Sequence, residues 1–68
     1  MKMSEAQKQF YLDEAEKYVS TLEKELTRAS AQNAYHALVK LHNLSLSIES
    51  LNIRYAAACE KVNDRFPS

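Results

Sequence analysis

The side chains in this sequence that could do chemistry are two histidines, one cysteine and four tyrosines. A histidine can carry protons or bind a metal, and a cysteine can act as a nucleophile or bind zinc. His36 and His42 are six positions apart, which puts them on different faces of a helix, so they cannot share a metal ion. Cys59 has no second cysteine to pair with and is interpreted as a small apolar residue. We therefore expect no metal site, disulfide or bound cofactor.

His42 begins a stretch that partly resembles the phosphorylated helix of histidine phosphotransfer domains. That motif has a lysine three residues after the histidine and a glycine four residues after it, and these keep the imidazole accessible. Ser45 and Leu46 occupy those positions here. We therefore expect His42 to be a partly buried member of an apolar helix face. Helices of this pattern also offer no nucleophile–base pair, so the sequence predicts a protein that is not an enzyme.

Helices are the elements that must position these residues. The chain has 68 residues, no glycine and a single proline, Pro67, so helix is favoured almost throughout. Ser4 and Gln7 form a capping box, which predicts that a first helix begins at residue 5 and continues to about residue 29. Apolar residues recur every three or four positions along one face of this helix: Leu12, Ala15, Val19, Leu22, Leu26 and Ala29.

A second stripe with the same spacing predicts a long helix over residues 34–65, after a turn over residues 30–33. Asn33 suits either the end of the first helix or the N-cap of the second. The stripe comprises Ala34, Ala37, Leu41, Leu44, Ile48, Leu51, Tyr55, Ala58 and Val62. A short turn makes the two helices antiparallel. The predicted fold class is all-α, and the single domain over residues 1–68 is an antiparallel two-helix hairpin with a coiled-coil-like seam.

The predicted second helix carries more apolar surface than the first helix can cover. Its apolar arc spans roughly two thirds of the circumference, whereas a surface helix usually has an arc of slightly more than about 100°. Exposed apolar residues are common singly, but burying one large aliphatic side chain is worth ~1.5–3 kcal/mol. The residues beside the seam are therefore candidates for contact with a partner protein: Tyr35, Leu38, Val39, His42, Leu46 and Ile53.

Composition limits the kind of partner. Nine basic and nine acidic residues leave no net charge, and no basic face is available for the phosphates of a nucleic acid. The sequence shows no secretory signal at its start and no apolar run long enough to span a membrane. We expect a cytoplasmic protein. A chain this short, without a disulfide or a structural zinc, usually depends on a partner for stability.

The order of motifs resembles that of the small needle co-chaperones of bacterial type III secretion. The residues that carry the resemblance are Lys24-Glu25-Leu26-Thr27-Arg28, a short polar turn, Tyr35-His36-Ala37-Leu38, and the apolar helix through Leu51, Ile53, Arg54 and Tyr55. The similarity covers roughly residues 12–60, although the glycine common in that turn is absent. The resemblance implies a bacterial hairpin that binds a tetratricopeptide-like chaperone and stabilises it. Through this chaperone it would keep the needle subunit unpolymerised before export.

A second hypothesis stays open. Two hairpins could pair into a four-helix bundle, as a homodimeric regulatory or RNA-binding protein. The balanced charge argues against RNA. Self-association of the chain in isolation is compatible with both hypotheses.

Overall fold

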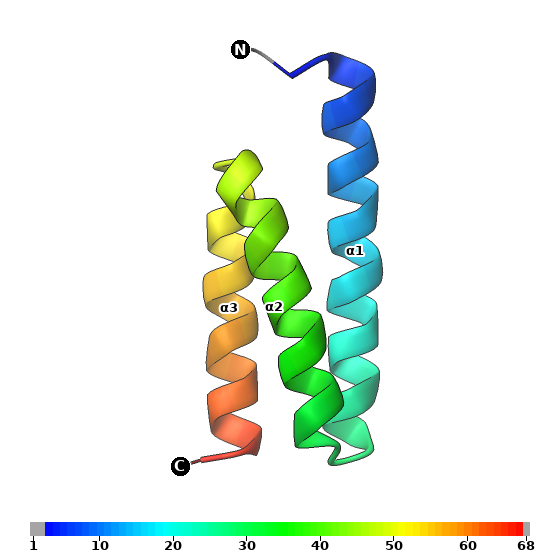
Figure 1. The fold of residues 1–68 in the computed structure, drawn as a ribbon. Helices are drawn as coiled ribbons and strands as arrows, with labels where there is room; N and C mark the ends of the chain where they lie inside the picture. The colour runs from blue at the N-terminus through cyan, green and yellow to red at the C-terminus, as the bar shows by residue number, and fades with distance from the viewer. Residues whose placement is uncertain (1–2, 68) are drawn as a thin grey trace.

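Three helices make up the computed structural model, which describes residues 3–67. Helix α1 spans Glu5–Thr27, α2 spans Ala31–Ser47 and α3 spans Leu51–Arg65. The helices lie side by side with alternating directions, and α2 packs against both of the others (Figure 1). The described residues contain no strand, which confirms the predicted all-α class.

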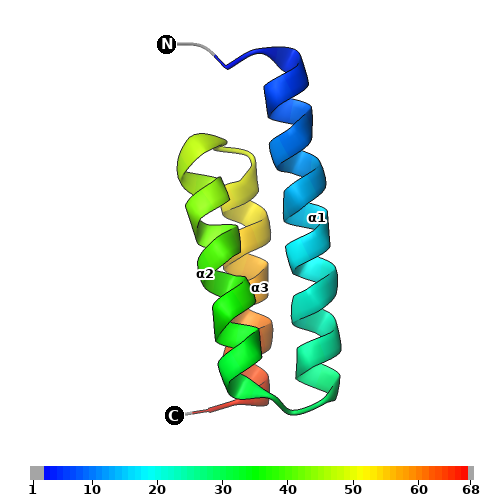
Figure 2. The ribbon, with the colours of Figure 1, turned by 45° about the vertical axis from the view of Figure 1, so that its right-hand side comes forward.

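The prediction of a two-helix hairpin is wrong in its second half. The expected helix over residues 34–65 is interrupted at 48–50, where Ile48 has an extended backbone with φ −131° and ψ 110°. The chain reverses there, and α3 returns along α2 (Figures 1 and 2). Two backbone hydrogen bonds follow the reversal, from Leu51 N to the Ile48 carbonyl at 3.0 Å and from Asn52 N to the Glu49 carbonyl at 3.0 Å.

Length explains why folding back is favourable. At about 1.5 Å per residue, a continuous helix over 34–65 would be about 48 Å long, whereas α1 has 23 residues and spans about 35 Å. The end of such a helix would extend past α1 and leave its apolar residues in water. Folding α3 back instead buries Leu51, Ala58 and Val62 to 4% exposure or less. Near the end of α2, Ser45 Oγ donates to the His42 carbonyl at 2.6 Å, a type of bond that often bends helices.

The predicted seam is buried despite the break. Every residue of the second stripe is buried or partly buried, and so is every residue of the first stripe except Ala29. The largest fully buried side chains are Leu22, Leu41 and Val62, one from each helix. The core therefore lies between the three helices, and each helix contributes to it.

Polar contacts connect α3 to α1. They are the ion pair of Arg54 with Glu16, the ion pair of Lys61 with Glu23 at 3.6 Å, and a hydrogen bond from Arg65 Nε to the Leu26 carbonyl at 3.1 Å. Both ion pairs are more than half exposed, and such pairs contribute only about 0–1 kcal/mol each. They orient α3 along α1, while apolar burial holds it there.

The turn between α1 and α2 covers residues 28–30, earlier than the predicted 30–33. The first helix ends with a capping motif that does not involve Asn33. Ser30 N donates to the Glu25 carbonyl at 3.0 Å, and Ala29 N donates to the Leu26 carbonyl at 3.2 Å. These two bonds form a Schellman motif, which needs a left-handed residue just after the helix. Ala29 takes that role with φ 59°. The position usually holds glycine, because a Cβ makes this conformation unfavourable.

Asn33 is not a cap of either helix. It lies inside the first turn of α2, and its Nδ2 donates to Glu25 Oε2 at 3.2 Å. Glu25 is only 8% exposed and also pairs with Arg28 at 3.5 Å. The carboxylate therefore links the end of α1 to the start of α2. At the other end of α1, Ser4 Oγ accepts a hydrogen bond from Gln7 N at 3.1 Å, so the predicted start of the helix is confirmed.

Ala29→Gly should stabilise the protein by about 0.5–1 kcal/mol, because relief of the left-handed alanine outweighs the greater freedom of glycine in the unfolded chain. The measurement is urea unfolding followed by circular dichroism. Ala56→Gly, an exposed position inside α3, is the control and should destabilise by about 1 kcal/mol. A loss of stability with Ala29→Gly would contradict the Schellman assignment.

Leu41→Ala should destabilise the fold by about 2–5 kcal/mol, because it leaves a cavity where the three helices meet. Val39→Ala is the matched control, since Val39 lies two residues away on α2 and is 59% exposed. Thermal and urea unfolding of both variants would measure the difference. Equal effects would mean that the core is not centred on Leu41.

Candidate protein-binding surface

One face of α2 carries three exposed apolar side chains, Tyr35, Val39 and Leu46, which we call the α2 stripe. Their exposed fractions are 42%, 59% and 73%. At about 100° per residue, the three positions fall within about 40° of one another around the helix. Figure 2 shows α1 beside α2 and α3 behind it, so two sides of α2 are covered by the rest of the chain. Single exposed apolar residues are common, but three on one face form a patch, which makes this face the candidate for protein binding.

His42 and Leu38 lie on the side of the α2 stripe that the protein itself covers. The His42 ring packs against Tyr55 of α3, with ring centroids 4.7 Å apart, and is partly buried as predicted. Leu38 packs against the core and is also partly buried. These two candidate residues are therefore less available than Tyr35, Val39 and Leu46, because α3 returns along α2.

Ile53 is separate from the other candidate residues. It lies on α3 and is 80% exposed, the highest value among the exposed large hydrophobic residues. Two residues along a helix correspond to a rotation of about 200°, so Ile53 faces away from the buried Leu51. On the predicted continuous helix, Ile53 would have extended the face that carries Leu46. The break at 48–50 assigns the two residues to different helices.

The surroundings of the α2 stripe carry little charge. Lys40 is the only residue of α2 with a formal charge. Its Nζ lies 5.8 Å from the ring centroid of Tyr18 on α1, a cation–π contact that directs the charge toward α1. At the start of the stripe, Tyr35 packs near Phe66, with ring centroids 6.5 Å apart. The sequence indicated no role for Phe66, because only the reversal of α3 brings it beside Tyr35.

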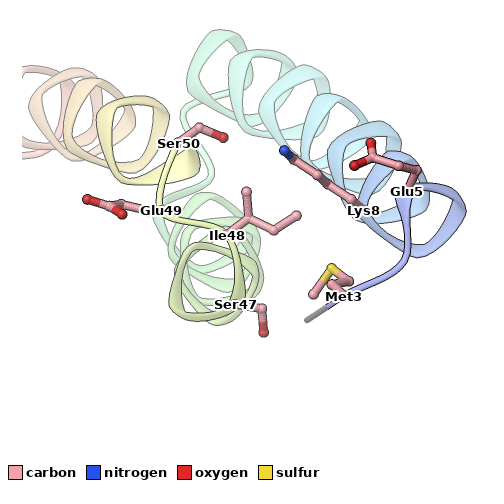
Figure 3. Close-up of a pocket in the computed structure, with 7 residues that line it drawn as sticks. All are labelled: Met3, Glu5, Lys8, Ser47, Ile48, Glu49 and Ser50. Atoms are coloured by element: carbon pink, nitrogen blue, oxygen red, sulfur yellow. The ribbon is translucent and has the colours of Figure 1, made fainter. Parts of the chain in front are cut away.

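A recess lies at the other end of the molecule, between the first turn of α1 and the reversal at 48–50. Figure 3 shows its lining residues: Met3, Glu5, Lys8, Ser47, Ile48, Glu49 and Ser50. Its charged groups are all exposed, and the Glu49 carboxylate points away from α1. Within residues 3–67, no buried side-chain nitrogen or oxygen lacks a hydrogen-bond partner. The recess thus offers shape but no buried polar group to fix a ligand.

Residues 3–67 contain no group of three or more His, Cys, Asp or Glu side chains that could hold a metal ion. None of the three helices combines the length and the apolar character that crossing a membrane requires. Comparison with known protein families, curated proteins and solved structures finds no match for this chain. The function must therefore be inferred from the surface itself.

The phenol of Tyr55 and the thiol of Cys59 lie one turn apart on α3. A side-chain hydrogen bond with Cys59 raises the pKa of Tyr55 above its usual value of 10.0, and partial burial and the charge of the thiolate act in the same direction. The folded state therefore holds this proton more tightly than the unfolded state does. The stability from this difference is present below pH 10 and is lost as the pH rises through the raised pKa.

Tyr55→Phe should remove part of the loss of stability at alkaline pH. We expect the free energy of unfolding of the wild type to fall as the pH rises past 10.0, and the variant to fall less. Urea titrations at neutral and alkaline pH measure this difference. Tyr35→Phe is the control, because it keeps both Tyr55 and Cys59. Parallel pH profiles for the wild type and Tyr55→Phe would contradict the assignment.

Proposed function

We propose that this protein is a cytoplasmic co-chaperone of a bacterial type III secretion system. In this role it binds and stabilises a tetratricopeptide-like chaperone, which keeps the needle subunit unpolymerised before export. The observation that carries the binding part is the α2 stripe, exposed and almost free of charge. The nature of the partner rests on the resemblance of residues 12–60 to needle co-chaperones. The protein has no catalytic role in this proposal.

Energetics support binding through the α2 stripe. Full burial of one large apolar side chain is worth ~1.5–3 kcal/mol, so Val39 and Leu46, both more than half exposed, could together contribute a few kcal/mol on docking. Tyr35 adds a large ring with a polar tip, the type of side chain that is enriched in interfaces. A domain of this size is only marginally stable alone, so such a gain would be large relative to its stability.

The spacing of the α2 stripe suits a helical partner. Tetratricopeptide repeats stack helix pairs into a concave surface. An amphipathic helix docks in such a groove through apolar residues that recur on one face. Tyr35, Val39 and Leu46 present that pattern, and α1 with α2 keeps the antiparallel arrangement of the expected hairpin.

No observation in the structure favours the RNA-binding alternative. Four basic side chains form ion pairs with acidic ones: Lys17, Arg28, Arg54 and Lys61. Their charge is partly neutralised within the chain. RNA binding needs a basic surface free to displace counterions from phosphates.

Leu46→Glu should weaken the complex with the chaperone at least ~10-fold, because it places a charge at the most exposed apolar residue of the α2 stripe, within the proposed contact. Isothermal titration with a purified tetratricopeptide-like chaperone of a type III system measures the affinity. The helix content should not change, since Leu46 is 73% exposed in the free protein. Mixing the wild type with the chaperone should also raise the thermal stability of both.

Two further variants complete this test. Ser20→Glu, an exposed position on α1, is the control and should bind as the wild type does. Ile53→Glu reports whether the contact extends onto α3, as the candidate residues predict. Unchanged binding by both Leu46→Glu and Ile53→Glu would contradict the proposed surface.

A further inference from the structure

The reversal at 48–50 is less firmly fixed than the turn at 28–30. The first turn is a Schellman motif around the left-handed Ala29, a conformation that residues inside a helix do not adopt. At the second reversal, Ile48 has an extended backbone, whereas Ser50 already has a right-handed helical one, with φ −62° and ψ −18°. A change of the backbone near Ile48 would therefore join α2 and α3 into one helix.

The sequence across 48–50 is compatible with a continuous helix. It contains no glycine or proline, and Leu44, Ile48 and Leu51 keep the three-or-four spacing of the buried seam. The reversal also lacks side-chain caps: within residues 3–67, the Ser50 hydroxyl accepts no hydrogen bond from the first turn of α3, and the last turn of α2 holds no basic residue. In a joined helix, the backbone groups at these two ends would bond to one another.

The contacts that hold α3 do not require it to belong to the same chain. Leu51, Ala58 and Val62 are buried against the other two helices. Aromatic and charged contacts join residues before the reversal to residues after it: His42 with Tyr55, Tyr35 with Phe66, Glu16 with Arg54, and Glu23 with Lys61. The surface of α1 and α2 that α3 covers is therefore complementary to the α3 of any copy of this chain.

The antiparallel arrangement of α2 and α3 allows a reciprocal exchange. If two joined helices lie antiparallel with a twofold axis at 48–50, each α3 runs along the α2 of the other copy in the direction in which it runs along its own. Helix α1 has 23 residues against 17 in α2, and it extends past the reversal (Figure 1). A joined helix would continue beside this additional length of α1. The exchange therefore keeps the contacts of α3 and closes as a pair.

We propose that residues 48–50 are a hinge and that two copies of this chain exchange α3, so that each α3 packs on α1 and α2 of the other copy. In the exchanged dimer, α2 and α3 form one continuous helix over residues 31–65. This inference goes beyond the proposed function, because it concerns the buried face of α2 and not the α2 stripe. Exchange needs two chains, so the protein concentration sets the balance between the closed monomer and the dimer.

Glu49→Pro tests the hinge. A proline fits here in the closed monomer, because Ile48 before it is extended and residue 49 is the second residue of the turn closed by Leu51 N and the Ile48 carbonyl. Within residues 3–67, the Glu49 amide donates no hydrogen bond that proline would remove. In a continuous helix the same proline is strongly unfavourable. The variant should keep the helix content of the wild type, and its dimer dissociation constant should be at least ~100-fold higher, because each dimer contains two hinges.

Sedimentation equilibrium of the full chain, over micromolar to millimolar concentrations, measures these dissociation constants. Glu49→Ala is the matched control, since it removes the same exposed carboxylate but favours helix. It should dimerise at least as tightly as the wild type. A wild type that stays monomeric at all these concentrations, or equal dissociation constants for the two variants, would overturn the proposal.

A distance within one chain shows whether the dimer is exchanged. Gln32→Cys and Asn63→Cys, both at exposed positions, carry spin labels in a Cys59→Ala background. The labelled chain is refolded from urea with an excess of unlabelled chain, so that most labelled dimers hold one labelled copy. Pulsed electron resonance of the dimer fraction should give about 46 Å between the labels, the span of residues 32–63 in a continuous helix. The monomer fraction should give a much shorter distance, because the start of α2 and the end of α3 lie at the same end of the molecule (Figure 1).

The same measurement distinguishes the exchange from other kinds of association. A dimer whose labels stay as close as in the monomer has each α3 packed on its own chain. Such a dimer would form through another surface, such as the α2 stripe, and would overturn the proposal. Neither experiment uses the chaperone, so failure of the exchange would leave the proposed function intact.

Discussion

The structure depends on covering one helix, α2, whose apolar surface is wider than a single neighbour can bury. Ala37 and Leu41 are buried in the core, and Tyr35, Val39 and Leu46 lie on another face of the same helix. Helix α1 covers one side. The chain reverses at Ile48 and lays α3 along another side of α2, which leaves Tyr35, Val39 and Leu46 exposed. Apolar burial is the main favourable term in folding. The reversal is therefore explained by the burial of apolar surface on α2, and not by a turn motif in the sequence.

Much of the packing, but not the topology, could be predicted from the sequence. Apart from Ala29, the seam positions are buried or partly buried as predicted, because their burial depends only on the three-and-four spacing, which is the same whether α2 and α3 form one helix or two. Leu44, Ile48 and Leu51 keep that spacing across the break, and no glycine or proline marks it. The reversal depends on tertiary packing, since it becomes favourable only when Leu51 and Val62 contact the surface formed by α1 and α2. The local sequence pattern does not include the free energy of these contacts, so it could not predict the reversal.

The candidate surface, like the packing, could be predicted only in part. Exposure of Tyr35, Val39 and Leu46 follows from their place on the wheel, because neither neighbouring helix covers that sector. The partial burial of His42 was predicted, but its contact with Tyr55 was not, since that contact requires α3 to run back beside α2. The same holds for Ile53, which the break moves to another helix. A helical wheel drawn for one continuous helix places Leu46 and Ile53 on the same face, whereas in the folded chain they lie on two different helices.

Incomplete cover is what connects this fold to protein binding. The three helices of residues 3–67 can bury their inner surfaces, but within these residues no fourth element covers the outer face of α2. Adding polar residues there would have removed the need for cover, and the neutral side chains around Lys40 show that this face is instead kept free of charge. Any protein that docks on the stripe supplies the missing element and stabilises the folded state by mass action. Binding and folding are therefore linked, so a partner that covers Leu46 also raises the free energy of unfolding of the core around Leu41.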